Sequence, residues 1–379
     1  MLTKLIKNIT EYFCQELNVF ILTTIIMDYY RIMHIQNFWT FRTIFRLSLT
    51  FCLAYISIIP IKAIGEELNI YSHRQPFLIN PFLKVFTEKT GIKTNVVYST
   101  KGLAQRLKAE GENSPADVIL TVDIGRLQVY ADLKLLAKIN SQKLNENIPP
   151  HLRSLDKTWV GLSKRSRIIV VSKSRVKPSS ISRIEDLANP TWKKKICSRP
   201  GSHVYNRALM ASMIAAHGID EATEWAKGLV ANLARRPQGN DRAQVKAIYE
   251  GQCDIAIINN YYYGKLKYSD DPQQRAWAEE LYLIFPNQGP GDRGAHINIS
   301  GGGVAKYSKN KIGALRLLEF LSEEESQKLY GTINFEYPVN PKVIPTEILQ
   351  NWGSFREDKL PIQRIAEFSQ DAQKIIDKV

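Results

Sequence analysis

Three consecutive tyrosines, at positions 261–263, are the side chains whose types and spacing most directly suggest chemistry. They follow the apolar run at residues 255–258 and two asparagines. A short run so rich in β-branched residues is typical of a buried strand in an α/β sheet. Ligands of such sheets bind beyond the carboxyl ends of the strands, so we expect the phenol groups at the lip of a cleft. An ionised phenol is a hard anionic donor, which suits a hard, highly charged metal ion such as Fe(III). Taken alone, three tyrosines are more often aromatic core or rim residues.

Four further positions could complete a site in such a cleft. His73 follows the first expected strand and therefore lies at the same kind of sheet edge as the tyrosines, although a lone histidine there is more often a surface or capping residue. Tyr205 follows the turn at residues 200–202, where a strand leads into a helix whose first N–H groups can bind an anion. Arg167 could hold an oxyanion with both guanidinium nitrogens, or form a salt bridge between lobes. Asn240 is another polar side chain at an expected helix start.

Enzyme motifs are absent from the sequence. It contains no GxSxG, GxxxxGK[ST] or HExxH pattern, and its six histidines do not recur at metal-binding helical spacing. Asp117 and Asp123 follow or belong to a strand, but no second acid is placed to form an acid/base pair, and Asp123 is typical of a helix N-cap. We therefore expect no enzyme. A hydrolase or lyase on the same fold is an alternative that would need the missing nucleophile and base.

Strands and helices alternate along most of the chain. Expected strands at residues 68–71, 93–98 and 116–121 alternate with expected helices at 77–90, 103–110 and 124–131, which predicts a parallel sheet covered by helices. The long extended stretch at 159–172 carries charges in its middle, which suits a crossing between two lobes. Three glycines at 301–303 predict a hinge or a tight turn. The tail from Pro361 has the apolar stripe of a helix docked on the body.

Length and composition favour a folded, exported protein. The chain has 379 residues, of which 44% are hydrophobic and 23% charged, and this length allows two domains of ordinary size or one large one. Arg42 and Arg46 precede an apolar run at 47–61, so we expect a signal peptide at 33–63 and an upstream extension at 1–32; an uncleaved membrane anchor is the alternative. Export would permit a disulfide between Cys197 and Cys253, with two buried free thiols as the other interpretation.

Positive charge predominates but does not indicate a nucleic-acid partner. The net charge is +14, and the first 63 residues contribute three of these charges, which leaves +11 on the rest. The basic residues are scattered, and their one dense run, at 193–195, reads as a solvated edge. The excess charge could instead favour an anionic membrane surface or an acidic partner.

Several of these segments together resemble one known family. The chain is similar to the periplasmic ferric-iron-binding proteins of ATP-binding-cassette importers, the iron-deficiency-induced and ferric-binding group. The resemblance covers nearly all of residues 67–355. The segments that carry it are residues 69–74, 90–93, 107–111, 114–118, 164–167, 237–241, 259–262 and 336–339.

The resemblance implies a fold and a division into lobes. It implies an α/β, two-lobe periplasmic-binding-protein fold of type II, transferrin-like, which closes over its cargo. Each lobe would hold a mixed, mainly parallel sheet covered by helices, with hinge strands between the lobes. The first lobe would comprise residues 64–166 and 292–340, and the second lobe residues 167–291 and 341–379.

The resemblance also implies metal ligands. Tyr261 and Tyr262 match the paired tyrosines of the family, and Tyr205 matches a third, in a Tyr-Asn pair that opens a helix. His73 falls near the ligand of the first lobe. Some members carry that ligand slightly later, where this chain has Gln75 and Pro76, and some use a glutamate that is absent from residues 100–102. Residues expected to hold an anion or to support the ligands are Arg167, Asn240, Asn259, Ser202 and Tyr263.

The implied cargo is Fe(III), with a synergistic anion such as carbonate, citrate or phosphate. The expected partner is an ATP-binding-cassette permease in the inner membrane, served by a periplasmic monomer with no nucleic-acid partner. The sequence leaves Fe(III) against Fe(II) and the identity of the anion open. A metal-free receptor for a small anion or organic solute, such as sulfate, a polyamine or thiamine, is the alternative function.

Overall fold

The computed structural model describes residues 67–379. The expected upstream extension at 1–32 and signal peptide at 33–63 lie outside the described residues. Within residues 67–379, none of the helices combines the length and apolar character needed to cross a membrane.

One eight-stranded mixed sheet runs through this part of the chain. Its strand order is β2-β1-β3-β8-β4-β6-β5, and β7 pairs with β4 beside this path. Parallel pairing joins β1 to β2, β1 to β3 and β5 to β6, whereas the other four strand pairs are antiparallel. The strands are β1 (Glu67–Ser72), β2 (Lys93–Tyr98), β3 (Val118–Thr121), β4 (Val160–Ser172), β5 (Ile196–Cys197), β6 (Ile255–Asn259), β7 (Leu281–Ile284) and β8 (Ile297–Val304).

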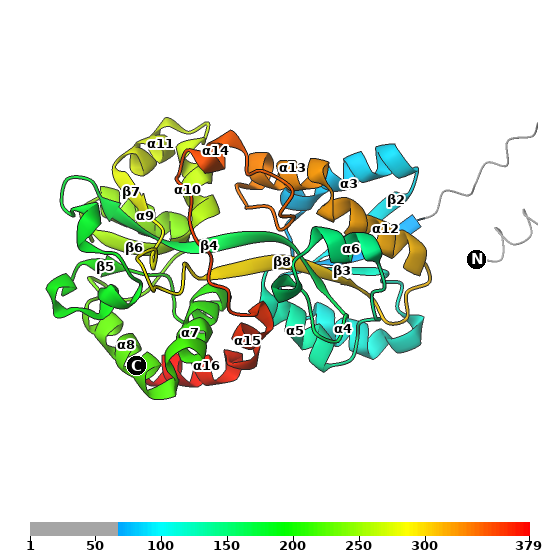
Figure 1. The fold of residues 1–379 in the computed structure, drawn as a ribbon, viewed down its shortest axis with the longest axis horizontal. Helices are drawn as coiled ribbons and strands as arrows, with labels where there is room; N and C mark the ends of the chain where they lie inside the picture. Colours follow the sequence, from blue (N-terminus) through cyan, green and yellow to red (C-terminus); the bar gives the residue numbers. More distant parts are fainter. Residues whose placement is uncertain (1–66) are drawn as a thin grey trace, which may run out of the picture. The chain divides into compact units, whose positions relative to one another are not determined.

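The long strand β4 belongs to both ends of this sheet. Its first part, from Val160 to Ser166, pairs with β8, and its second part, from Arg167 to Val171, pairs with β6. In Figure 1 the green β4 and the yellow β8 run side by side between two groups of elements. The change of partner between Ser166 and Arg167 falls where we expect the first lobe to give way to the second, and that division remains a prediction.

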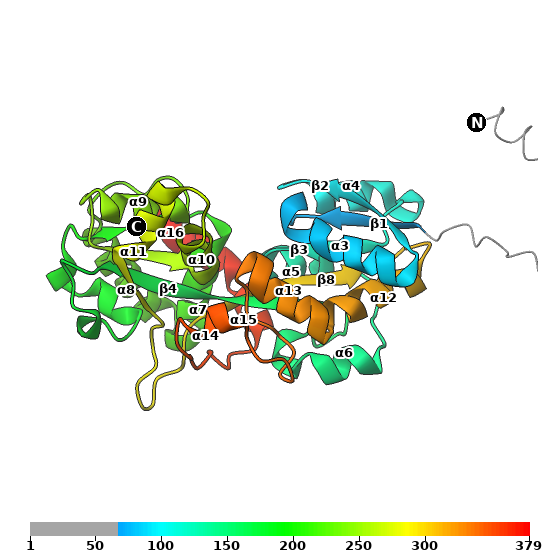
Figure 2. The ribbon, with the colours of Figure 1, turned by 90° about the horizontal axis from the view of Figure 1, so that it is seen from above.

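Helices cover the sheet in two groups, one at each end of β4. Figures 1 and 2 show α3, α4, α6 and α12 with β1 to β3, and α8 to α11 with β5 to β7. The helices are α3 (Pro76–Thr90), α4 (Leu103–Glu110), α5 (Ile124–Asp132), α6 (Gln142–Asn147), α7 (Val204–His217), α8 (Ile219–Ala231), α9 (Asp241–Tyr249), α10 (Asn260–Lys267), α11 (Pro272–Glu279), α12 (Lys311–Ser322), α13 (Glu324–Asn334), α14 (Glu347–Gln350), α15 (Ile362–Glu367) and α16 (Ser369–Lys378).

The three glycines at 301–303 do not form a tight turn, and their role as a hinge stays a prediction. They lie inside β8, between β3 and β4. A Cβ atom on Gly301 would come within 2.7 Å of the carbonyl oxygen of Val160, and one on Gly302 within 2.9 Å of that of Ile119. Glycine is required here because neighbouring backbones approach too closely for a side chain.

The two cysteines outside the N-terminal segment form a disulfide. Cys197, in β5, is bonded to Cys253, just before β6, with their Cα atoms 5.9 Å apart. Both residues are buried. The bond therefore joins two neighbouring strands of the group of elements that carries the tyrosines.

Candidate metal centre

The three candidate tyrosines meet although two of them are far apart in the sequence. Tyr261 and Tyr262 occupy the first turn of α10, directly after β6, and Tyr205 is the second residue of α7. The hydroxyl of Tyr261 donates a hydrogen bond of 3.0 Å to the hydroxyl of Tyr205. The rings of Tyr261 and Tyr262 lie with their centroids 4.5 Å apart. The fold thus brings hard oxygen donors from two helix starts together at the carboxyl end of β6.

Burial keeps the phenols of Tyr261 and Tyr262 protonated in the metal-free protein. It raises the pKa of Tyr261 well above 10.0, and the neighbouring Tyr205 and Tyr262 add to the shift. The pKa of Tyr262 is raised as well, again chiefly by burial. A cation that binds to these oxygens must therefore displace their protons.

Positive charge surrounds the ring of Tyr205. The guanidinium carbons of Arg199, Arg165 and Arg167 lie 4.9, 5.4 and 5.9 Å from the centre of the ring. Cations at this range attract an anion that binds beside the ring. The site therefore presents positive charge next to the phenol oxygens.

Arg167, which the sequence singled out for an anion, has both terminal nitrogens bonded to protein groups, while its Nε is buried without a hydrogen-bond partner among the described residues. It is buried, and its guanidinium donates to Asp241 at 2.7 Å, to Asn206 at 2.6 Å and to Asn259 at 3.3 Å. The partner Asp241 reaches it from the start of α9. Arg167 thus supports the site from behind, through Asn206 and Asn259, and its two terminal nitrogens are already bonded.

Arg165 is a site residue that the sequence reasoning missed. It lines a small cleft together with Tyr205 and Tyr261. One of its terminal nitrogens contacts the carbonyl oxygen of Val122 and lies 3.6 Å from Asp123. The other, Nη1, is buried without a partner among the described residues. This open donor, in a cleft beside two phenols, is suited to an oxyanion.

Residues from the other end of β4 close the same cleft. Arg74 follows β1, and its guanidinium pairs with Glu336 at 2.5 Å. Lys265, one helical turn after Tyr261 on α10, reaches across and lies near the ring of Phe77 in α3, 5.6 Å from its centre. Burial lowers the pKa of Lys265. The cleft is lined by Arg74, Leu78, Val122, Arg165, Tyr205, Tyr261, Lys265, Asn334 and Glu336.

His73, the expected ligand of the first lobe, is not in this cleft. Its Nδ1 donates to the carbonyl oxygen of Ser99 and its Nε2 accepts from the hydroxyl of Tyr130, both at 2.8 Å. Burial, aided by the charge of Arg126, lowers the pKa of His73 to about 4, so the ring is neutral at neutral pH. In this arrangement neither ring nitrogen is free to take a metal ion.

Of the remaining predicted site residues, one contacts a candidate ligand and the other three have roles elsewhere. Asn259 donates to the hydroxyl of Tyr261 at 3.3 Å and so supports a candidate ligand directly. Tyr263 is buried with its ring edge-on to Trp352, which is a packing role. Asn240 is exposed and caps α9 through the N–H of Ala243. Ser202 is exposed and lines a different, apolar cavity.

No conventional metal site competes with the tyrosines in the described part of the chain. Residues 67–379 contain no group of three His, Cys, Asp or Glu side chains arranged to hold a metal ion. The candidate donors are therefore the phenol oxygens, with three arginine side chains around Tyr205.

Comparison with known proteins assigns the chain to one family. Residues 82–357 match the model of the family described as bacterial extracellular solute-binding protein. The chain belongs to this family. Its members bind solutes and are not enzymes, and the type II periplasmic-binding-protein fold expected from the sequence is confirmed by the solved structures that this solute-binding protein resembles.

Several relatives are named for iron. This solute-binding protein is 40% identical over 314 residues, 83% of this chain and 87% of the relative, to iron uptake protein A1 of Synechocystis. It is 30% identical over 287 residues, 74% of this chain and 83% of the relative, to a major ferric iron-binding protein of Neisseria meningitidis. A Trichodesmium structure described as a complex with iron and citrate ligands matches with a TM-score of 0.78 at 44% identity, covering 82% of this chain and 98% of that one.

Proposed function

We propose that this protein captures Fe(III) in the cleft through the phenol oxygens of Tyr205, Tyr261 and Tyr262. The observation that carries the proposal is the 3.0 Å contact between the hydroxyls of Tyr205 and Tyr261, with Tyr262 beside them. The iron-named relatives support the same cargo. Three ionised phenols would balance the charge of the metal ion, and hard oxygen donors favour Fe(III) over softer ions.

An oxyanion completes the site in this proposal. Arg165 offers a buried, unpartnered N–H group beside Tyr205, and Lys265 adds a second cation at the same cleft. A carboxylate-rich anion such as citrate, or a smaller one such as carbonate or phosphate, could bind both the metal and these cations. The similar Trichodesmium structure, described with iron and citrate, supports this class of anion.

His73 contributes to iron only after a rearrangement. Its ring would have to give up the hydrogen bond from Tyr130 to free Nε2, while the bond from Nδ1 to Ser99 would keep the ring in the correct tautomer. We therefore assign the initial capture of iron to the three tyrosines and leave His73 as a candidate that joins later.

The family points to import. Extracellular solute-binding proteins serve ATP-binding-cassette permeases, and we propose that this one delivers iron to such a permease from the periplasm, as a monomer exported by its signal peptide. The two lobes would close over the cargo, and the permease would recognise the closed, iron-loaded conformation.

The direct test is spectroscopic. Purified metal-free protein mixed with ferric citrate should develop a visible phenolate-to-iron charge-transfer band. Tyr261→Phe and Tyr262→Phe should each weaken that band and the affinity for iron, and the double variant should lose both, because each change removes one donor oxygen. Tyr263→Phe is the matched control, since its ring packs against Trp352, and it should keep the band.

Two results would refute the proposal. One is an unchanged band and affinity in the folded double variant. The other is calorimetry in which metal-free protein binds sulfate, a polyamine or thiamine tightly while ferric citrate gives no band. The second result would instead support a metal-free solute receptor.

A further inference from the structure

One buried carboxylate, that of Asp241, lies behind the tyrosine site. Asp241 is the first residue of α9 and is fully buried. One of its oxygens accepts hydrogen bonds from Arg167 at 2.7 Å and from the backbone N–H of Asn259 at 2.9 Å. The other oxygen accepts a hydrogen bond of 3.0 Å from Arg199. Within residues 67–379, no other carboxylate lies within ion-pair distance of either guanidinium. A single side chain therefore joins β4, the loop before α7 and the end of β6.

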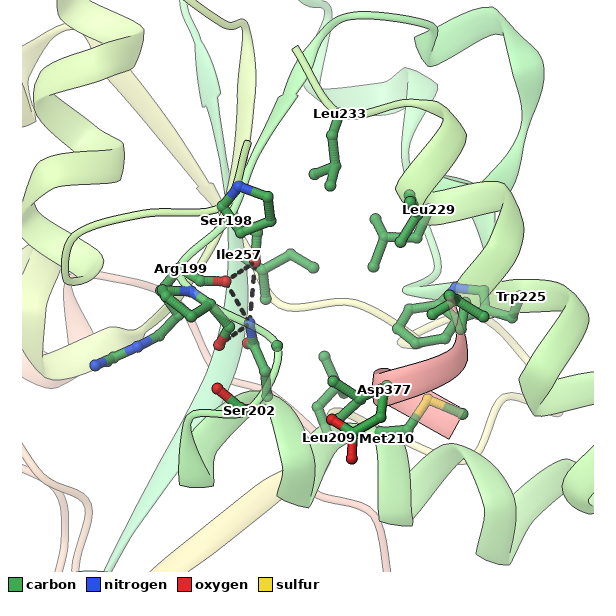
Figure 3. Close-up of a pocket in the computed structure, with 18 of the residues that line it drawn as sticks. Ser198, Arg199, Ser202, Leu209, Met210, Trp225, Leu229, Leu233, Ile257 and Asp377 are labelled. Carbon is green, nitrogen blue, oxygen red and sulfur yellow. Dashed lines mark hydrogen bonds between the residues drawn. The ribbon is translucent and has the colours of Figure 1, made fainter. Parts of the chain in front are cut away.

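The two arginines continue this network to the helix start that carries Tyr205. Asn206 directly follows Tyr205, and its side-chain oxygen accepts a hydrogen bond of 2.6 Å from Arg167. Its amide nitrogen donates to the carbonyl oxygen of Arg199 at 3.0 Å. Figure 3 draws this bond among the dashed lines beside Arg199, and it shows the guanidinium of Arg199 extending away from the apolar cavity next to this loop. Both ends of the Asn206 side chain are thus held by the arginines that pair with Asp241.

A second branch of the network reaches Tyr261. Arg167 donates to the side-chain oxygen of Asn259 at 3.3 Å, and the amide of Asn259 donates to the hydroxyl of Tyr261 at 3.3 Å. Because the backbone N–H of Asn259 is bonded to Asp241, this residue is held at both its backbone and its side chain. Asn259 ends β6 directly before α10, the helix that carries Tyr261. Asp241 is therefore connected to both helix starts whose hydroxyls meet at 3.0 Å.

We propose that Asp241 is a positioning residue of the iron site, whose carboxylate fixes the helix starts of Tyr205 and Tyr261 so that both oxygens can bind one metal ion. The inference rests on the proposed function, because it takes these phenols as ligands. A carboxylate is needed because the three groups around it are all N–H donors, and an ionised carboxylate offers only acceptors. Its charge also offsets the mutual repulsion of two guanidiniums.

The direct test replaces this carboxylate with an amide of the same shape in the full chain. In Asp241→Asn an NH₂ group would face one of the N–H donors, so the network must break at one oxygen. Iron affinity of the folded variant, measured by chelator competition, should fall roughly ten- to a hundredfold, about the strength of one charge-assisted hydrogen bond. The charge-transfer band should also shift in wavelength, because the two phenolates no longer meet the metal ion in the same geometry.

Asp117→Asn is the matched control for the loss of a buried carboxylate. Asp117 is buried, accepts hydrogen bonds of 2.7 Å from Ser308 and 3.0 Å from the backbone N–H of Asn69, and does not line the cleft. Both asparagine variants should be less stable than the wild type in urea, but Asp117→Asn should keep the wild-type band and iron affinity. Equal losses of iron affinity in the two variants would overturn the proposal, because destabilisation alone would then explain them.

The wild-type measurement separates this inference from the proposed function. A wild-type protein that gives no charge-transfer band would refute iron binding by the phenols, and this inference with it. A wild-type band together with an unchanged band and affinity in folded Asp241→Asn would refute the positioning role of Asp241 alone.

A double-mutant cycle tests whether Asp241 acts through Tyr205. In the Tyr205→Phe background, Asp241→Asn should cost roughly threefold less affinity than in the wild type, because one of the two positioned donors is already gone. The same fold loss in both backgrounds would show that Asp241 acts on the protein in general, and its positioning role would be wrong.

Asn206→Ala keeps the test decisive if Asp241→Asn does not fold. It removes the link to the Tyr205 helix start but leaves Asp241 with its three donors. Iron affinity should fall roughly three- to tenfold, the loss expected for one hydrogen bond, and the band should shift. An unchanged band and affinity in folded Asn206→Ala would refute the route from Asp241 to Tyr205.

Discussion

The candidate ligands experience two opposed electrostatic influences. Burial holds the phenols of Tyr261 and Tyr262 in the protonated form. The charge of Arg165 acts in the opposite direction on the pKa of Tyr261, and the charge of Arg199 does so on the pKa of Tyr262. A trivalent cation tips this balance, because it replaces each phenolic proton at once. The phenols of Tyr261 and Tyr262 therefore stay protonated until a metal ion binds.

Iron affinity should therefore fall in acid. Each phenol must lose a proton to bind, so every displaced proton weakens apparent binding about tenfold per pH unit below the phenol pKa. The slope of log affinity against pH, measured by chelator competition with correction for the chelator's own protonation, should lie between two and three for the wild type. Tyr262→Phe should lower that slope by about one. A slope near zero would contradict phenolate ligation.

Arg165 and Arg167 should differ sharply when each is changed to glutamine. Arg165→Gln should cost less stability than Arg167→Gln, because Asp123 lies 3.6 Å away and keeps hydrogen bonds from Gly125 and Asn298. It should weaken citrate-dependent iron binding roughly ten- to a hundredfold, since one charge-assisted hydrogen bond is lost. Arg167→Gln should instead cost about 1–3 kcal/mol of unfolding free energy, because Asp241 loses one of its two buried arginine partners and keeps Arg199 at 3.0 Å. Urea unfolding and chelator competition measure the two effects. Exchanged phenotypes would show that Arg167, not Arg165, holds the anion.

The sequence could not distinguish these two arginines. They lie two residues apart on β4 and therefore face the same side of the strand. They differ in their contact with Asp241, the first residue of α9, which accepts a hydrogen bond from Arg167 but not from Arg165. The place of Tyr261 and Tyr262 at the end of β6 was predictable in contrast, because a buried strand leads to the sheet edge, and their role as metal ligands stays a prediction.

At the scale of elements, close packing holds α10 and its tyrosines in place. A Cβ atom on Gly264 would come within 2.5 Å of Phe335 and 2.6 Å of Trp352, so α10 lies tightly against these rings. The disulfide between Cys197 and Cys253 joins the strand before Tyr205 to the chain before β6. The starts of α7 and α10, which carry the candidate ligands, therefore both follow chain segments that the disulfide holds together.

Removing the disulfide should lower the free energy of unfolding but leave iron binding by the folded protein nearly unchanged. Replacing Cys197 and Cys253 with alanine frees a loop with a sequence separation of 56 residues, and chain entropy alone predicts a loss of about 4 kcal/mol. Urea unfolding of the double variant, beside the wild type with and without reductant, measures the loss. The folded variant should keep its charge-transfer band. A loss below about 1 kcal/mol would contradict a bracing role.

Element boundaries were predictable wherever local signals mark them. The helix α4 and the strand β2 have the expected bounds, and Gly91, with a φ of 73°, ends α3. The single helix expected from Pro361 is two helices, α15 and α16, which are separated at Phe368. The tight turn predicted at the glycines of β8 was wrong because the reason for glycine there is non-local. The backbones that exclude a side chain belong to strands more than a hundred residues earlier in the sequence.

On the scale of the whole described molecule, an ion cluster ties separate segments together beside β4. Glu357, near the C-terminal helices, lies 2.6 Å from Lys164 of β4 and 3.2 Å from His151. Burial opposes ionisation of Glu357, but the hydrogen bond from His151 and the charge of Lys164 outweigh it and lower the pKa to about 2.

This cluster should contribute an acid-sensitive part of stability. The contribution is present above the unfolded pKa near 4.5 and is lost as the pH falls towards about 2, and its size is of the order of 2 kcal/mol. Urea unfolding at pH 6 and at pH 3 measures it. Glu357→Gln should be less stable than the wild type at pH 6, and the difference should narrow at pH 3. A constant difference would show that Glu357 acts without its charge.

The shared strand β4 also has a consequence for how this gene product can be divided. The thirteen residues of β4 pair with β8 at one end and with β6 at the other, so any cut within β4 leaves each fragment with a truncated strand and an unpaired sheet edge. The free N–H and C=O groups of such edges pair with other chains. The two halves, expressed as separate polypeptides, should aggregate rather than survive as independent modules.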